Sequence, residues 1–154
     1  MSSAPVYFEQ LQPAIAWLQS LVTGQLRTDS RLVNPGDGFI AWPGGVTDGR
    51  SHVAAALERG AVACLVEREG VEAFELPGPV ATFTGLKAAT ALLADQWLDH
   101  PSQHLQVLAV TGTNGKTSTA WWLAHALAQY QQGARHGCAM VGTLGIGVPP
   151  HVVS

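Results

Sequence analysis

A strand-like run, a glycine-rich turn and a helix-like pattern follow one another over residues 107–119, and they constrain the fold more than any other stretch. Residues 107–110 are all apolar, as in a buried strand, and Thr111-Gly-Thr-Asn-Gly115 has the composition of a turn. Glycines let backbone N–H groups approach phosphate oxygens, and the N-terminus of the next helix adds the positive end of its dipole. The sequence therefore predicts a phosphate-binding loop between a strand and a helix.

Seven residues of this loop are candidate ligands of a nucleotide. Lys116 is expected to reach the β- and γ-phosphates, and the Thr117 hydroxyl is expected to ligate Mg²⁺. The full set of candidates is Gly112, Thr113, Asn114, Gly115, Lys116, Thr117 and Ser118. The general kinase and GTPase pattern has a further glycine five residues before Gly115, where this chain has Val110. This departure disfavours a kinase, and an ordinary glycine-rich turn is the plainer alternative.

Apolar periodicity elsewhere predicts an alternation of helices and strands. Thr84 is expected to cap the N-terminus of its helix, and Pro13 is expected in the first turn of another. The helices are predicted within residues 7–22, 50–59, 84–98 and 116–131, and the strands at 26–31, 39–42, 61–66, 80–83, 107–110 and 138–141. The continuous apolar run at 61–66 is typical of a strand buried on both faces.

This order of elements predicts an α/β fold with two domains. Pro101-Ser-Gln-His104 is the best boundary, so we expect a small α/β domain over residues 1–103 and the first βαβ unit of a mononucleotide-binding domain over 104–154. A parallel sheet needs several strands and cover on both faces, which so short a second domain cannot supply. We therefore expect the chain to be the front part of a longer protein, or a partner chain to complete its sheet.

Composition narrows the class of protein further. Hydrophobic residues make up 47% of the chain and charged residues 12%, against a usual charged share of about 25%, so the chain is globular. A net charge of −3 and only two lysines, without a basic run, disfavour nucleic-acid binding. No apolar stretch approaches the ~20 residues of a membrane span, and no signal peptide is visible. Cys64 and Cys138 lie in apolar runs and are expected to be reduced, buried thiols, and the chain is expected to be cytoplasmic.

The first hundred residues contain a series of short motifs: Thr28-Asp-Ser-Arg31, Pro35-Gly-Asp37, Phe39-Ile-Ala41, Gly44, Asp48-Gly-Arg50 and Gly60-Ala61. This series resembles the substrate domain of the Mur ligase family. The loop Gly112-Thr-Asn-Gly-Lys-Thr117 and the later Gly142-Thr-Leu-Gly145 are similar to the same family, and most of all to its members that add the third amino acid. Gly38 and the segment Gly45-Val-Thr47 depart from the family pattern.

The resemblance implies an ATP-dependent ligase that forms an amide bond during synthesis of peptidoglycan precursors. ATP would phosphorylate the carboxylate of UDP-MurNAc-L-Ala-D-Glu, and the amine of a diamino acid, diaminopimelate or lysine, would attack the acyl phosphate. Lys116 would be the catalytic residue that stabilises charge on the γ-phosphoryl group, and Thr117 would hold Mg²⁺. Because the family enzyme has further domains, this chain is expected to be inactive alone. Contacts to the uridine diphosphate end are implied for Thr28, Ser30, Gly45, Val46 and Thr47.

Several alternatives stay open at this point. The Mur ligase that adds D-alanyl-D-alanine shares the motifs of the first domain, although Asn114 and the Gly142 motif favour the third-step enzyme. A folate-type polyglutamate ligase shares the loop but lacks such a first domain. A non-catalytic module that binds a UDP-sugar or a nucleotide belongs to a different class. Among single residues, Asp29 and Asp48 are turn residues or ligands, and Arg50 is a diphosphate partner or a solvated side chain.

Overall fold

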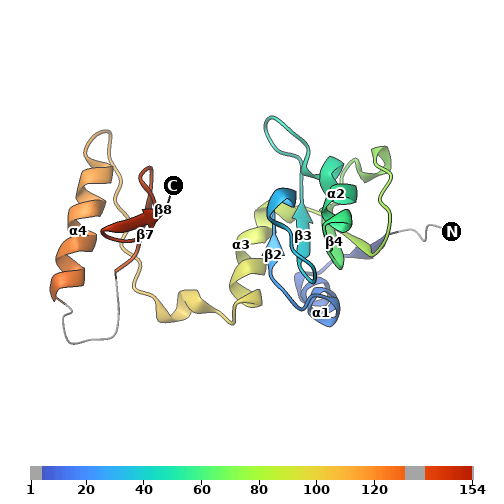
Figure 1. The fold of residues 1–154 in the computed structure, drawn as a ribbon, viewed down its shortest axis with the longest axis horizontal. Coiled ribbons are helices and arrows are strands. Elements are labelled where there is room, and N and C mark those ends of the chain that lie inside the picture. Colours follow the sequence, from blue (N-terminus) through green and yellow to red (C-terminus); the bar gives the residue numbers. More distant parts are fainter. Residues whose placement is uncertain (1–4, 131–137, 154) are drawn as a thin grey trace. The chain divides into compact units, whose positions relative to one another are not determined.

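The computed structural model describes residues 5–130 and 138–153 of the chain. It divides into two compact units, residues 1–105 and 106–154 (Figure 1). The division lies just after the predicted boundary segment, Pro101–His104, which forms a short 3₁₀ helix, η4. The roles assigned to the two predicted domains stay predictions.

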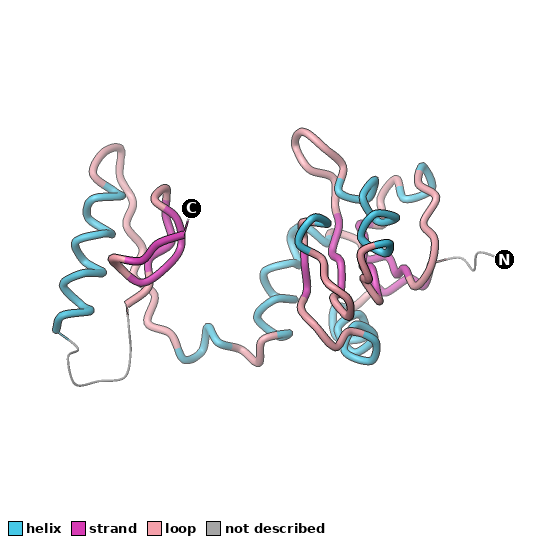
Figure 2. Tube along the Cα trace, in the orientation of Figure 1, coloured by secondary structure: helices cyan, strands magenta, loops and turns pink. Residues whose placement is uncertain are grey.

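The first unit is built on a five-stranded sheet in which every pair of neighbouring strands is parallel. The strands stand in the order β1-β5-β4-β3-β2, so the longest strand, β4, lies at the centre between β5 and β3. Figure 2 distinguishes the strands, in magenta, from the helices, in cyan. Helix α1 connects β1 to β2 and helix α2 connects β3 to β4, as parallel crossovers require, and helix α3 follows β5. The strands are β1 (Val6–Phe8), β2 (Leu26–Arg27), β3 (Gly38–Ala41), β4 (Ala63–Glu67) and β5 (Val80–Phe83), and the helices are α1 (Leu11–Leu21), α2 (Val53–Glu58) and α3 (Leu86–Trp97).

Both faces of this sheet are covered, as the run at 61–66 predicted. Alternate residues of β4 serve opposite cores: Leu65 packs with α1 and α3 on one face, and Cys64 packs with α2 on the other. All five residues of β4 are buried. The alternation follows from the two-residue period of a strand, which turns successive side chains to opposite faces.

The beginning of the chain differs from the predicted helix over residues 7–22. Residues Val6–Phe8 form β1, which pairs with β5 in the register Val6↔Ala81 and Phe8↔Phe83. Helix α1 begins only at Leu11, and Pro13 lies in its first turn as predicted. The apolar spacing in this stretch suits a helix, but pairing with a distant strand satisfies the backbone of residues 6–8 in an extended form.

The N-terminus of α3 is capped by a residue that the sequence did not indicate. Gly85, not Thr84, is the N-cap, and it has no side chain to offer. Glu67, at the end of β4, accepts the backbone N–H groups of Gly85 and Leu86 at 3.0 and 2.7 Å. A carboxylate at this position satisfies two N–H groups that lack intrahelical partners and faces the positive end of the helix dipole.

The second unit contains helix α4 (Lys116–Tyr130) and an antiparallel sheet. The helix agrees with the prediction as far as it is described, and the predicted strand at 138–141 appears as β6. Residue 131, where this helix was predicted to end, lies outside the described residues. The strands of this sheet are β6 (Met140–Gly142), β7 (Gly145–Val148) and β8 (His151–Val153), in that order.

The predicted strand at 107–110 is wrong: these residues have no strand conformation, so the expected βαβ unit is not formed. Val107 and Leu108 are 78% and 63% exposed. The physical reason is pairing, because a strand needs a neighbour for its backbone groups. In the described part of the chain β6 pairs antiparallel with β7 and leaves residues 107–110 without one.

Among the described helices, none is both long and apolar enough to cross a membrane.

Candidate functional site

Two positive backbone angles shape the glycine-rich loop ahead of α4. Gly112 has φ 145° and Gly115 has φ 76°, values that residues other than glycine rarely adopt. A Cβ at Gly115 would meet no atom within 4 Å, so conformation, not space, requires glycine there. The helix then begins at Lys116, and Thr119 N–H donates to the Gly115 carbonyl at 2.9 Å.

Two side chains of this loop make polar contacts within the second unit. The ammonium of Lys116 donates to the carbonyls of Gly112 and Thr113, with N–O distances of 2.6 and 3.4 Å. The hydroxyl of Thr117 lies 2.9 Å from the hydroxyl of Thr143. Thr143 belongs to the Gly142-Thr-Leu-Gly145 motif, so this motif was the sequence signal for a residue not predicted as part of the site.

These residues fit a polyphosphate group and its cation. Residues 111–116 are exposed, and the first N–H groups of a helix such as α4 have no intrahelical acceptor. A lysine ammonium and free N–H groups suit phosphate oxygens, and a hydroxyl oxygen such as that of Thr117 suits Mg²⁺. The ammonium of Lys116 donates to two loop carbonyls, and on binding of a phosphate group it would donate to phosphate oxygens instead.

A pocket of about 490 Å³ lies on the first unit, beside the short 3₁₀ helices η1 (Ser30–Leu32) and η2 (Gly49–His52). Of the five residues predicted to contact the uridine diphosphate end, the structure brings three together here, and Gly45 and Val46 do not line the pocket. Val46 is fully exposed. The lining consists of Thr28, Asp29, Ser30, Arg31, Thr47 and His52. His52 was missed because a single histidine two residues after Asp48-Gly-Arg50 gives no pattern of its own.

An ion pair forms part of this pocket wall. Asp29 accepts the backbone N–H of Arg31 at 2.9 Å and pairs with its guanidinium, with the closest N–O distance at 2.7 Å. These hydrogen bonds lower the pKa of Asp29 to about 2. Asp29 therefore caps η1, as one of its two interpretations proposed, and it also lines the pocket.

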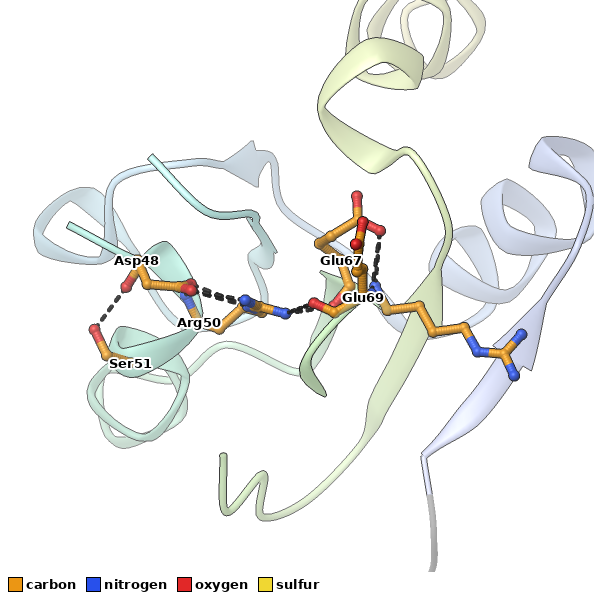
Figure 3. A network of polar contacts seen from close by, with 6 residues as sticks. Asp48, Arg50, Ser51, Glu67 and Glu69 are labelled. Carbon is orange, nitrogen blue, oxygen red and sulfur yellow. Dashed lines mark hydrogen bonds and ion pairs between the residues drawn. The ribbon is translucent and has the colours of Figure 1, made fainter. Parts of the chain in front are cut away.

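Asp48 and Arg50 form a second ion pair (Figure 3). The pair lies at the end of the loop of residues 43–48, but neither residue lines the pocket. Arg50 is only 6% exposed, so the prediction of a solvated side chain is wrong. Its guanidinium donates to Asp48 and to the carbonyls of Glu67 and Glu69, which leaves no free edge for a diphosphate. Hydrogen bonds from Arg50 lower the pKa of Asp48. Asp48 is thus the turn residue that caps η2.

Comparison with known proteins places the chain among ligases. The profile of the family described as "Mur ligase family, catalytic domain" matches residues 24–109, more than half of the chain. A UDP-N-acetylmuramoyl-L-alanyl-D-glutamate–2,6-diaminopimelate ligase from Acidovorax sp. (strain JS42) is 65% identical over 144 residues, which cover 91% of this chain and 29% of that protein. The enzyme of the same name from Pseudomonas aeruginosa is 44% identical over 146 residues, or 93% and 28%. The chain thus spans less than a third of these relatives.

Solved structures agree. A structure of a ligase with the same name has a TM-score of 0.59 and 29% identity, and the match covers 83% of this chain and 25% of that one. MurF ligase from Thermotoga maritima, solved in complex with ADP, has a TM-score of 0.54 and 28% identity, with 71% and 24% covered. Profile, relatives and fold agree, and the chain belongs to the Mur ligase family.

Proposed function

We propose that this chain is part of an ATP-dependent ligase that joins 2,6-diaminopimelate to UDP-MurNAc-L-Ala-D-Glu, acting in the cytoplasm on small-molecule substrates. The observation that carries the proposal is 65% identity, over 144 residues, to a ligase named for this reaction. Lysine in place of diaminopimelate and the D-alanyl-D-alanine-adding reaction are less favoured, because the similar sequences cited above share the diaminopimelate name.

In this proposal the first unit binds the uridine diphosphate end of the substrate. Thr28, Ser30 and Thr47 offer hydroxyl groups in one pocket, which suits a ligand rich in hydrogen-bonding oxygens. Arg31 and His52 add donors on the same wall. Gly45 and Val46 lie on the same loop as Thr47, and their contribution would require the loop to fold over the ligand.

The second unit, in the same proposal, binds the phosphates of ATP through residues 112–118. Lys116 would move from the carbonyls of Gly112 and Thr113 onto the γ-phosphoryl group and stabilise the charge that develops there. Thr117 would hold Mg²⁺, which neutralises phosphate charge when bound. Transfer of the phosphoryl group to the substrate carboxylate would give the acyl phosphate that the amine attacks. Residues beyond this chain are expected to complete that chemistry.

The test is a calorimetric titration of the chain with UDP-MurNAc-L-Ala-D-Glu, with UDP-GlcNAc and Mg·ATP titrated separately. We expect the muramyl dipeptide to bind more tightly than UDP-GlcNAc, and Mg·ATP to bind independently of both. Lys116→Ala should weaken Mg·ATP binding about tenfold or more, since a charge-assisted contact contributes roughly 1.5–3 kcal/mol. The same variant should bind the sugar nucleotide normally.

Two outcomes would contradict this proposal. A folded chain that binds Mg·ATP but neither sugar nucleotide would refute the assignment of the first unit. Equal affinity for UDP-GlcNAc and the muramyl dipeptide would favour a general UDP-sugar-binding module over the third-step ligase.

A further inference from the structure

We propose that Arg50 is a positioning residue that holds the Thr47 and His52 wall of the pocket on the first unit. The proposal rests on the proposed function, since it assumes that this pocket binds the uridine diphosphate end of the substrate. Arg50 does not line the pocket itself. It lies in the chain between Thr47 and His52, and it ties that segment to the central sheet.

The Arg50 side chain uses all three of its guanidinium nitrogens inside the first unit. Nε donates to Asp48 Oδ1 at 3.0 Å, and Nη2 donates to Asp48 Oδ2 at 2.7 Å. Nη1 donates to the carbonyl of Glu67 at 3.2 Å and also to that of Glu69. Figure 3 shows this chain of contacts running from Asp48 through Arg50 to the two glutamates. The planar fork of arginine matches a carboxylate in two places at once.

One of the two acceptors of Nη1, the Glu67 carbonyl, belongs to the buried central strand. Glu67 is the last residue of β4, whose five residues are all buried between two layers of helices. Its carboxylate also holds the N-terminus of α3. The guanidinium carbon of Arg50 lies 4.7 Å from the centre of the Phe74 ring, a cation–π contact on the segment that follows β4. Arg50 therefore links residues 47–52, which include the pocket residues Thr47 and His52, to the central strand β4.

The loop of residues 43–48 closes on Asp48, the partner of Arg50. Pro43 and Asp48 form an isolated bridge, Gly49 N–H donates to the Trp42 carbonyl at 3.1 Å, and Ser51 Oγ donates to the Asp48 carbonyl at 2.6 Å. Thr47 immediately precedes this closure and His52 ends the 3₁₀ turn after it. The placement of both pocket side chains therefore depends on Asp48 and on the arginine that holds it.

Lysine cannot replace Arg50 in this arrangement. Its single ammonium cannot bind two carboxylate oxygens side by side and also reach two carbonyls. Arg50→Lys keeps the positive charge and removes the fork, so it separates positioning from charge. Leu93→Ala is the matched control, because Leu93 is 1% exposed in the core between α1, α3 and the sheet and does not line the pocket.

The experiment measures dissociation constants of the full chain and its variants for UDP-MurNAc-L-Ala-D-Glu and for Mg·ATP, at a temperature where circular dichroism shows every variant folded. Arg50→Lys should weaken sugar-nucleotide binding about tenfold and leave Mg·ATP binding unchanged. Leu93→Ala should lower the melting temperature and leave both constants unchanged. Thr47→Ala should weaken sugar-nucleotide binding, and adding it to Arg50→Lys should cost less than the two single effects combined, because Arg50 acts through Thr47.

A measurement without ligand accompanies the titrations. Amide hydrogen exchange of residues 47–52 should be faster in Arg50→Lys than in Leu93→Ala at equal distance below their melting temperatures. Unchanged sugar-nucleotide affinity, fully additive effects with Thr47→Ala, or unchanged exchange in this segment would each overturn the positioning role. If the wild-type chain binds no sugar nucleotide while exchange in Arg50→Lys rises as expected, the proposed function fails and the structural hold on this segment stands.

Discussion

The two thiols of this chain occupy different surroundings. Cys64 is completely buried on β4, and burial raises its pKa to about 12. Cys138 is only half-buried, so the prediction of a buried thiol is confirmed for Cys64 alone. Because the thiolate is the reactive form, we expect iodoacetamide at pH 8 to alkylate Cys138 and to spare Cys64 in the folded chain. Peptide mass spectrometry measures both sites, and equal labelling in native buffer would contradict this expectation.

Asp37, in the turn at residues 34–37, is the most buried carboxylate among the described residues. It is 4% exposed and accepts hydrogen bonds from Gln25 N, Asn34 N and Arg27 Nε at 2.7, 3.1 and 3.2 Å. Burial alone would raise its pKa, but the hydrogen bonds from Gln25, Asn34 and Arg27 outweigh burial and lower it. A carboxylate with a lowered pKa stabilises the folded state fully above the unfolded value of about 3.9. That stability is lost as the pH falls through the folded value.

Replacing this carboxylate tests the argument. We expect Asp37→Asn to lower the free energy of unfolding at pH 7 by about 1–3 kcal/mol, because a buried site loses charged hydrogen bonds. The variant should also show a smaller loss of stability between about pH 5 and pH 2 than the wild type. Urea denaturation across this range measures both effects, with the exposed Glu58→Gln as control. A wild type and an Asp37→Asn variant with parallel pH profiles would contradict the assignment.

At the scale of elements, the start of α3 depends on a residue that lies eighteen positions earlier in the chain. The Glu67 carboxylate performs the capping that the sequence assigned to Thr84. We expect Glu67→Ala to destabilise the first unit by about 1–2 kcal/mol, in the range of a lost helix cap. Thr84→Ala should stay within about 0.5 kcal/mol of the wild type. Chemical denaturation followed by circular dichroism compares the two, and the reverse order of effects would restore Thr84 as the cap.

Two segments, one in each unit, differ most from their predicted secondary structure. Residues 6–8 read as helix by spacing but join β5 as a strand, and residues 107–110 read as a strand but find no neighbour among the described residues. In both places the secondary structure depends on whether a strand far away in the sequence pairs with the segment. The apolar run of β4, which has a strong local signal, formed a buried strand as predicted.

At the scale of the whole molecule, the described apolar cores belong almost entirely to the first unit. Both core clusters consist of residues before position 105, and the second unit contributes only Ala124, Met140 and Pro149 to the buried apolar residues described. Burial of apolar surface is the main favourable contribution to folding. We therefore expect residues 1–105 expressed alone to unfold cooperatively, with the same denaturant midpoint as the first unit of the whole chain.

Denaturation monitored by circular dichroism tests this expectation. Leu65→Ala, in the core between the sheet and helices α1 and α3, serves as a destabilised reference. A fragment of residues 1–105 that lacks a cooperative transition would show that the first unit needs the rest of the chain. The same fragment, if it binds UDP-MurNAc-L-Ala-D-Glu, would assign the sugar-nucleotide site to the first unit alone.

The sequence by itself determined the features that depend on neighbouring residues. The glycines at 112 and 115, the lysine and threonine after them and the apolar run of β4 are local features, and together with the family motifs they predicted an α/β ligase fragment. Tertiary structure decided what depends on distant partners: the strand at 6–8, the Glu67 cap, the burial of Arg50 and the meeting of Thr28, Thr47 and His52. Hydrogen bonds and burial between remote segments leave no periodic pattern in the sequence, so only the folded chain could reveal them.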